Sequence, residues 1–133
     1  MKEHQLSICI PAKNEEHNVA PLAVAIKRSL ERRPDLNFEI IFVDDGSTDH
    51  TLEMLRKEAR ADPRVRYVSL ERNYGQTTAL LAGVRASRGS IIATMDGDLQ
   101  NDPDDIPSML AELQDCDMVC GIRQKRMDSW MRK

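Results

Sequence analysis

The chain has 133 residues, of which 41% are hydrophobic, 31% charged and 4% aromatic, and its formal net charge is −3. This size and composition predict one soluble globular domain and exclude a disordered chain. The negative charge and the few aromatic residues argue against nucleic-acid binding, which depends on basic surfaces and stacking platforms.

The cysteines and the apolar runs exclude two further classes of protein. Cys9, Cys116 and Cys120 are an odd number with no zinc-site spacing, so we expect reduced thiols in a cytoplasmic protein rather than a disulfide framework. The amino-terminal apolar run is too short for a signal peptide. No apolar run approaches the roughly 20 residues that span a bilayer.

Strand and helix patterns alternate along the chain. Short apolar runs predict strands at 5–11, 38–43, 65–70, 90–95 and 117–122, the third of them weaker and alternating, as in an edge strand. Helices are expected from about Asn18, after a cap at Asp49, after Gly75 and after a cap at Asp104. The first helix has an apolar stripe formed by Val19, Leu22, Ala23, Ile26 and Leu30. In the third helix, Gly83 would allow close packing on the sheet.

This alternation predicts a three-layer α/β domain around a mainly parallel sheet. Right-handed crossovers bring the carboxyl ends of all parallel strands to one edge of the sheet. Polar clusters follow each of the first four strands there: PAKNEE, DDGSTD, ERNYG and DGDLQ. If the strand order is 3-2-1-4, the ligand crevice lies between the first and fourth strands.

The predicted edge carries carboxylates and lacks the usual glycine-rich phosphate loops. Neither G-x-G-x-x-G nor G-x-x-x-x-G-K-[ST] occurs. The carboxylates at the strand ends are Glu15, Asp44, Asp45, Asp96 and Asp98. A phosphate-bearing ligand can meet such an edge through a divalent cation, and the oxygens of Asp96, Asp98 and Gln100 suit Mg²⁺ or Mn²⁺. The predicted ligand is therefore a metal-bound nucleoside diphosphate.

Each cluster taken alone has a simpler explanation. Asp102, Asp104 and Asp105 fit a turn and the start of a helix, and we assign them no chemistry. Residues 44–47 fit a plain turn, and Arg72 and Arg123 fit solvated charges. EF-hand spacing fails from either acidic cluster. A phosphatase with a D-x-D motif after a strand stays open as an alternative enzyme, although Gln100 stands where that motif has Thr or Val.

Four segments together resemble the inverting glycosyltransferases of family 2, which have the GT-A fold. They are ICIPAKNEEHNV, FVDDGSTDHT, ERNYGQTTALLAG and IIATMDGDLQNDP. The resemblance runs from about Ser7 to Arg123 and is greatest to the branch that transfers sugars to polyprenyl phosphates. It implies a Rossmann-like GT-A fold in which residues 5–123 form the nucleotide-sugar-binding half, truncated after the fifth strand. Residues 124–133 would be a basic tail, either a flexible extension or a contact with phosphate or a membrane surface.

The resemblance also implies roles for individual residues. The implied donor-binding residues are Pro11, Ala12, Asn14, Glu15, Asp44, Asp45, Gly46, Arg72, Asp96 and Arg123. Residues 11–15 would hold the nucleoside, Asp44 would read the base, and Arg123 would contact phosphate. Asp96 would face ribose and metal, while Asp98 and Gln100 would hold Mg²⁺ or Mn²⁺ against the diphosphate.

The chain ends at Lys133, where members of that family continue into an acceptor-binding half. We therefore expect a donor-binding fragment that does not complete transfer alone, with the catalytic base and acceptor residues lying beyond this end. The resemblance implies a polyprenyl-phosphate acceptor and a full-length protein at the cytoplasmic face of the membrane. A non-catalytic nucleotide-binding or interaction module of the same fold remains the second hypothesis, and the oligomeric state is not predicted.

Overall fold

The computed structural model describes residues 5–98 and 102–113. Its elements follow in the order β1 (Leu6–Ala12), α1 (Val19–Leu30), β2 (Phe38–Asp44), α2 (Thr51–Ala61), β3 (Val65–Ser69), α3 (Gln76–Ala86), β4 (Ile91–Thr94) and α4 (Asp105–Glu112). The four strands are parallel and lie in the order β3-β2-β1-β4. The predicted α/β class and strand order are confirmed, whereas the fifth strand at 117–122 and the tail lie outside the described residues.

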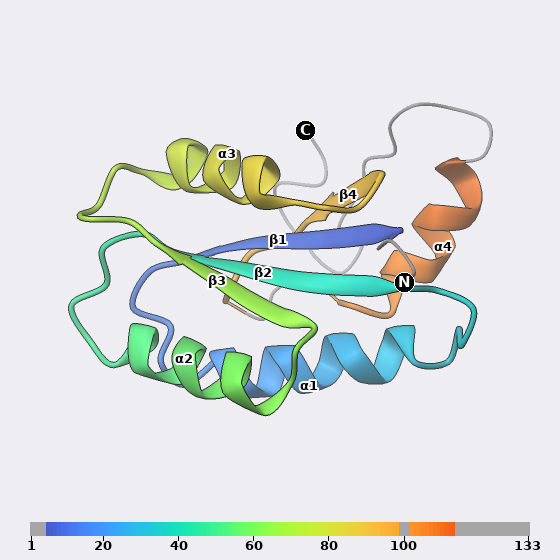
Figure 1. Cartoon of the computed structure of the whole chain (residues 1–133), viewed down its shortest axis with the longest axis horizontal. Helices are drawn as coiled ribbons and strands as arrows, with labels where there is room; N and C mark the ends of the chain where they lie inside the picture. Colours follow the sequence, from blue (N-terminus) through green and yellow to red (C-terminus); the bar gives the residue numbers. More distant parts are fainter. Residues whose placement is uncertain (1–4, 99–101, 114–133) are drawn as a thin grey trace, which may run out of the picture.

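Helices cover both faces of the sheet, as the three-layer prediction requires. In Figure 1, α3 lies on one face, and α1 and α2 lie on the other. The segment before α4 is joined to α1 by a hydrogen bond of 3.0 Å from the Ser29 hydroxyl to the Pro103 carbonyl oxygen. The loops that lead from β1, β2 and β3 into the following helices lie together at the left of Figure 1.

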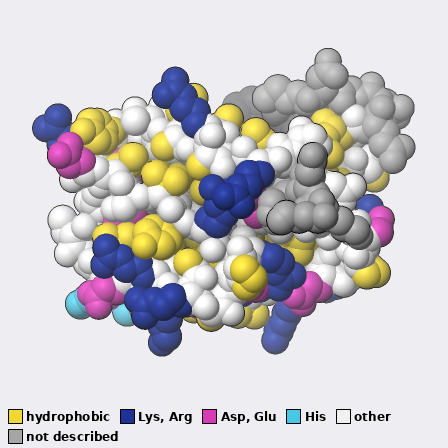
Figure 2. All heavy atoms as spheres, viewed as in Figure 1, with side chains coloured by type: hydrophobic (Ala, Val, Ile, Leu, Met, Phe, Trp, Pro, Cys, Tyr) yellow, Lys and Arg dark blue, Asp and Glu magenta, His cyan; other side chains and the backbone are white. Residues whose placement is uncertain are grey.

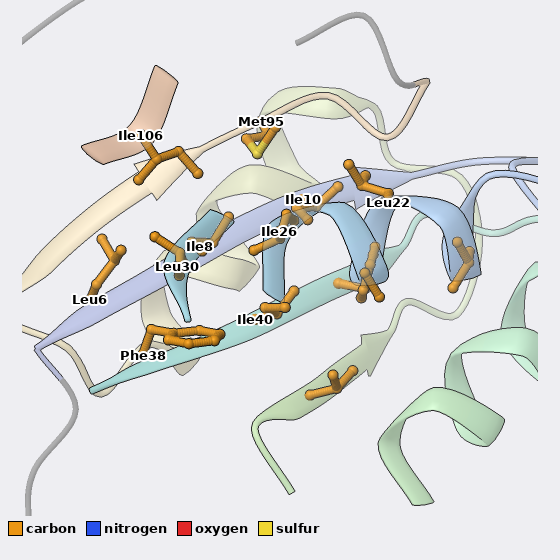
Figure 3. Close-up of a cluster of buried hydrophobic side chains, with 14 of the residues drawn as sticks. Leu6, Ile8, Ile10, Leu22, Ile26, Leu30, Phe38, Ile40, Met95 and Ile106 are labelled. Carbon is orange, nitrogen blue, oxygen red and sulfur yellow. The ribbon is translucent and has the colours of Figure 1, made fainter. Parts of the chain in front are cut away.

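The main hydrophobic core lies between the sheet and α1. Leu6, Ile8 and Ile10 of β1 lie beside the inward residues of α1 (Figure 3), because alternate residues of a strand point to the same face. All five residues of the predicted α1 stripe are buried. Burying an aliphatic side chain of this size stabilises the fold by about 1.5–3 kcal/mol. This core therefore fixes α1 on the sheet.

On the opposite face, α3 packs closely because Gly83 has no side chain. A Cβ placed at Gly83 would lie 3.1 Å from the Cβ of Cys9 and 3.3 Å from Cγ2 of Val43. The predicted role of Gly83 is therefore confirmed. Cys9 is a buried free cysteine, as expected, while Cys116 and Cys120 lie outside the described residues.

In the described sheet β4 pairs only with β1, and Ile92 is 40% exposed. One predicted detail differs in the structure. Asp49 was expected to cap the second helix, but His50 occupies the N-cap position of α2. The Asp49 carboxylate still accepts a hydrogen bond of 2.9 Å from the Thr51 N–H, so it satisfies a helix-terminal donor from one residue farther away.

The surface in Figure 2 carries Lys and Arg side chains in several separate groups among uncharged and hydrophobic ones. On this face the basic side chains form no continuous patch. Within residues 5–98 and 102–113, every helix is too short or too polar to cross a bilayer.

A buried carboxylate ties three strands together on the α3 side of the sheet. Glu39 of β2 is fully buried and accepts hydrogen bonds from the Ser7 hydroxyl (2.6 Å), an Arg66 guanidinium nitrogen (2.7 Å) and the Arg88 N–H (2.7 Å). Burial disfavours its charge, but these hydrogen bonds and the charge of Arg66 outweigh that effect and hold the pKa of Glu39 below its ordinary value.

We expect Glu39→Gln to lower the free energy of unfolding by about 2–4 kcal/mol at neutral pH, because one acceptor is replaced by a donor and Arg66 loses its buried partner. The pKa of Glu39 is lower in the native state than in the unfolded state. Its charge therefore stabilises the fold fully above the unfolded-state pKa, and this stabilisation is lost as the pH falls through the native-state pKa. Urea denaturation measures the free energy of unfolding of both proteins. The difference between wild type and Glu39→Gln should be smaller at about pH 3 than at about pH 7.

The exposed Glu71 provides a matched control, since Glu71→Gln makes the same chemical change at the surface. It should change the free energy of unfolding by less than about 0.5 kcal/mol. An equal loss of stability in Glu39→Gln at both pH values would show that shape rather than charge matters at this site.

Candidate functional site

A cleft of about 400 Å³ opens at the carboxyl ends of β1 and β4. The strand order reverses there, because β2 and β4 pair with opposite edges of β1. Ligands of open α/β sheets bind at such a point, and the volume falls within the roughly 300–1,000 Å³ of small-molecule sites. The lining residues are Pro11, Ala12, Lys13, Glu15, Asp45, Asn73, Gly75, Gln76, Asp96, Gly97 and Asp98. The cleft is therefore where the predicted crevice was expected.

Six of the residues predicted for a nucleotide and its metal line this cleft. They are Pro11, Ala12, Glu15, Asp45, Asp96 and Asp98. Four other predicted residues are described but do not belong to the lining, namely Asn14, Asp44, Gly46 and Arg72. Gln100 and Arg123 lie outside the described residues.

Asn14 joins the loop after β1 to the loop after β2. Its backbone has a φ of 55°, in the left-handed region that Asn tolerates better than most residues. Its side-chain oxygen accepts a hydrogen bond of 2.8 Å from the Thr48 N–H, and its own N–H donates to the Ser47 hydroxyl at 2.9 Å. Asn14 therefore holds these two loops together.

A second group of contacts strengthens the same junction. The Glu15 N–H donates to the Thr51 hydroxyl at 2.9 Å, and the Glu16 N–H donates to the Asp49 carboxylate at 3.3 Å. Burial disfavours the charged form of Asp49, but hydrogen bonds from Thr51 and Glu16 outweigh it, so the pKa of Asp49 lies below its ordinary value. The carboxylate therefore stays charged and keeps the α1 and α2 termini together.

Asp44 lies at the last position of β2 and is 3% exposed. One of its carboxylate oxygens accepts a hydrogen bond of 3.2 Å from the Ser47 N–H, which closes the turn after the strand. Its backbone carbonyl accepts from the Leu70 N–H at 2.9 Å and so anchors the end of β3.

Asp45 and Gly46 form the support for the loop before α3. Both carboxylate oxygens of Asp45 accept backbone hydrogen bonds, one from the Tyr74 N–H at 2.8 Å and the other from the Gly75 N–H at 3.1 Å. Gly46 has a φ of 70°, and a Cβ there would lie 2.3 Å from the Asn73 nitrogen. This close approach requires glycine. Asp45 thus lines the cleft but directs its carboxylate at the protein backbone.

Arg72 lies in the same loop but outside the cleft lining. Its side chain is exposed, and its guanidinium carbon lies 5.2 Å from the centroid of the Tyr74 ring. That distance is within the range of a cation–π contact. The arrangement therefore places the Arg72 charge against an aromatic ring of its own loop.

Five lining residues had no role assigned from the sequence: Lys13, Asn73, Gly75, Gln76 and Gly97. Gln76 is the first residue of α3, and its side-chain amide donates a hydrogen bond of 3.1 Å to Oδ1 of Asp96. Their place in the sequence could have indicated them, because PAKNEE and ERNYGQ both follow strands whose carboxyl ends meet at this edge of the sheet. Their polar side chains therefore reach the same cleft as the aspartates.

The described residues fit a divalent cation in part. Asp96 and Asp98 line the cleft, and Glu15 lies close to them, with its Cγ 3.6 Å from where a Gly97 Cβ would be. Among residues 5–98 and 102–113, no three carboxylate, His or Cys side chains converge as a preformed metal centre. Mg²⁺ is commonly bound by one or two carboxylates together with substrate phosphates and water, which is the arrangement that this donor set can provide.

The sequence matches a known protein family over nearly its whole length. The model of glycosyl transferase family 2 matches residues 7–133. The chain is 47% identical over 133 residues to dodecaprenyl-phosphate galacturonate synthase of Rhizobium johnstonii, covering 97% of this chain and 39% of that protein. It is 42% identical over 132 residues to undecaprenyl-phosphate 4-deoxy-4-formamido-L-arabinose transferase of Edwardsiella ictaluri, covering 96% and 40%. The chain thus spans about two fifths of these relatives.

Solved structures support the fold. The mannosyltransferase PcManGT of Pyrobaculum calidifontis, in complex with GDP-Man and Mn²⁺, matches with a TM-score of 0.75 at 23% identity, covering 95% of this chain and 37% of that one. S. aureus TarS 1-349 in complex with UDP-GlcNAc matches with a TM-score of 0.64 at 23% identity, covering 84% and 31%. The Rossmann-like GT-A fold predicted from the sequence is therefore confirmed.

The two roles of Asn14 can be separated by substitution. Asn14→Gly removes the side-chain acceptor but tolerates the left-handed backbone, so we expect a loss of about 1 kcal/mol in the free energy of unfolding. Asn14→Ala adds the steric cost of that backbone, and we expect a loss larger by about 1 kcal/mol. Urea denaturation measures both. Equal losses would mean that only the hydrogen bond to Thr48 contributes.

Proposed function

The chain belongs to glycosyl transferase family 2, and from that premise we propose that its cleft binds a nucleotide-diphospho-sugar as the donor of a glycosyl group. The observation that carries the proposal is the position of Asp96 and Asp98 at the strand-order reversal, in a cleft shared with the β1 loop. That position is where α/β sheets bind nucleotides.

The charge of the cleft supports binding of the diphosphate through a divalent cation. Glu15, Asp96 and Asp98 would repel a diphosphate directly, and Lys13 is the one basic residue in the described lining. We propose Asp96 and Asp98 as ligands of Mg²⁺ or Mn²⁺, with Gln100 as a third. When bound, the cation would neutralise negative charge that develops on the departing nucleoside diphosphate.

The β1 loop and the end of β2 are proposed to hold the nucleoside. Pro11, Ala12 and Glu15 line the cleft, and the hydrogen bonds of Asn14 fix the loop that carries them. Asp44 is nearly buried, and one of its oxygens is engaged by the Ser47 N–H. Its second oxygen is the proposed acceptor for a base N–H. Arg123 is proposed as a phosphate contact on the strength of its place in the family pattern.

The proposed acceptor is a polyprenyl phosphate, and the proposed stereochemical course is inversion. Support for the acceptor comes from the names of the two relatives, which describe a dodecaprenyl-phosphate synthase and an undecaprenyl-phosphate transferase. Support for inversion comes from the family resemblance. The whole protein is proposed to act at the cytoplasmic face of a membrane, where such acceptors are found.

The 133 residues themselves are proposed to bind the donor without completing transfer. They correspond to 39% and 40% of the length of the two relatives. We expect no transfer of radiolabelled sugar to undecaprenyl phosphate by this chain alone, supplied with UDP- or GDP-sugars and Mn²⁺. Product formation would show that the donor-binding half contains a complete catalytic apparatus.

Donor binding is tested by calorimetric titration of GDP and UDP, with and without Mn²⁺. We expect metal-dependent binding of at least one nucleotide, because the carboxylates of the cleft disfavour a free diphosphate. Asp98→Asn removes one charged ligand and should weaken metal-dependent binding by about 10- to 100-fold.

Asp102→Asn is the matched control for this variant. Asp102 belongs to the same acidic stretch, but its carboxylate accepts a hydrogen bond from the Asp104 N–H at 2.9 Å, at the start of α4. The substituted amide keeps that acceptor oxygen, so binding should be unchanged. Folded wild-type protein that binds neither nucleotide, or equal losses in the two variants, would contradict the proposal.

A further inference from the structure

We propose that Gln76 is a positioning residue, which orients the Asp96 carboxylate for the metal-bound diphosphate. The inference rests on the proposed function of the cleft and extends it to a residue on α3. Gln76 lines the cleft, and its Nε2 donates to Oδ1 of Asp96 at 3.1 Å. The two residues are 20 positions apart in the sequence and meet only because α3 begins beside the end of β4.

The position of Gln76 is fixed by hydrogen bonds between the residues that precede it and the buried Asp45 carboxylate. The residue before it, Gly75, has a φ of 103° and donates its N–H to Asp45, as the preceding Tyr74 N–H does. Asp45 is only 4% exposed, and its own N–H donates to the Ala12 carbonyl at 2.9 Å. The buried carboxylate of Asp45, directly after β2, thus sets where α3 starts, and the first side chain of α3 donates to Asp96.

The chemistry of a primary amide suits this position. The side-chain torsion of a carboxylate is soft, so a ligand carboxylate at a partly exposed site needs a partner to hold its plane. An amide N–H supplies one hydrogen bond without adding charge, so it does not neutralise the carboxylate. A Lys at position 76 could also donate, but its charge would compete with the metal. Partners of this kind typically change metal affinity by about 10- to 100-fold when they are removed.

The test compares Gln76→Met, Gln76→Lys and Thr77→Ala with wild type. Met preserves the length and helix propensity of Gln but cannot donate a hydrogen bond. Thr77 is the exposed next residue of α3 and does not line the cleft, so Thr77→Ala controls for any change in the first turn of the helix. Calorimetry with GDP and with UDP, each with and without Mn²⁺, gives two dissociation constants per nucleotide for each variant.

We expect Gln76→Met to weaken nucleotide binding in the presence of Mn²⁺ by about tenfold, the lower end of the range for such partners because the side chain is exposed. Binding without Mn²⁺ should not change. Gln76→Lys should weaken metal-dependent binding at least as much, but it should strengthen metal-free binding through attraction of its ammonium group to the phosphates. A merely structural role cannot produce these opposite changes.

The possible failures are distinct. If wild type shows metal-dependent binding and Gln76→Met binds equally well, the inference about Gln76 is overturned while the proposed function stands. If Gln76→Met or Thr77→Ala weakens binding equally with and without Mn²⁺, the start of α3 matters only for structure, and the inference is again overturned. If folded wild type binds neither nucleotide, the proposed function fails and the inference fails with it.

Discussion

Parallel pairing of β1 with β2 on one side and β4 on the other is the constraint on which the site depends. Each strand runs in the same direction, so every following loop leaves the sheet at the same edge. The chain reaches β2 and β3 on one side of β1 before it crosses to β4 on the other. Loops separated by about 80 residues, those after Ala12 and after Thr94, therefore border one cleft. The apolar residues that pin α1 to β1 hold this arrangement, because alternate residues of β1 cannot slip without exposing the core.

The carboxylates at this edge form two groups, one that bonds the protein backbone and one that is proposed to face the ligand. Asp44, Asp45 and Asp49 all accept hydrogen bonds from backbone N–H groups of turns or helix starts. Such bonds both stabilise the loops and fix their shape before any ligand arrives. On the α3 side of the sheet, Glu39 of β2 accepts hydrogen bonds from the Ser7 hydroxyl of β1, from the Arg66 guanidinium of β3 and from the Arg88 N–H between α3 and β4. The proposed ligand-facing carboxylates, Asp96 and Asp98, are thus carried by a framework of other carboxylates whose charge is already satisfied by protein donors.

The sequence allowed the fold to be predicted closely because its signals are local and mutually consistent. The apolar stripe of α1, the proline and turn residues, and Gly83 each specify one element or one contact, and all agree with a sheet of order 3-2-1-4. The site was predicted less completely. From the sequence alone, the segment after β2 could contact a ligand or could hold another loop in place. The positions of the Tyr74 and Gly75 N–H groups show that the Asp45 carboxylate holds the loop before α3. Gln76 lies in the segment ERNYGQTTALLAG but received no role from the sequence, because its partner Asp96 lies in a different strand–helix unit of the chain. The exposure of β4 also depends on which strand lies beside it, and not on its own residues.

The donor set explains why metal and nucleotide would bind together in the proposed function. Two aspartates from one short loop offer too few ligands for a hard cation, and among residues 5–98 and 102–113 no third carboxylate, His or Cys completes the set. Phosphate oxygens would complete the coordination, so each component would raise the affinity for the other by the same factor. The size of that coupling depends on how well Asp96 is held before binding, because a free carboxylate must lose rotational freedom when it coordinates. In the proposed function, the hydrogen bond from Gln76 restricts the rotation of the Asp96 carboxylate before the cation binds. The hydrogen bonds from Tyr74 and Gly75 to Asp45 fix the start of α3 and so place Gln76 within reach of Asp96.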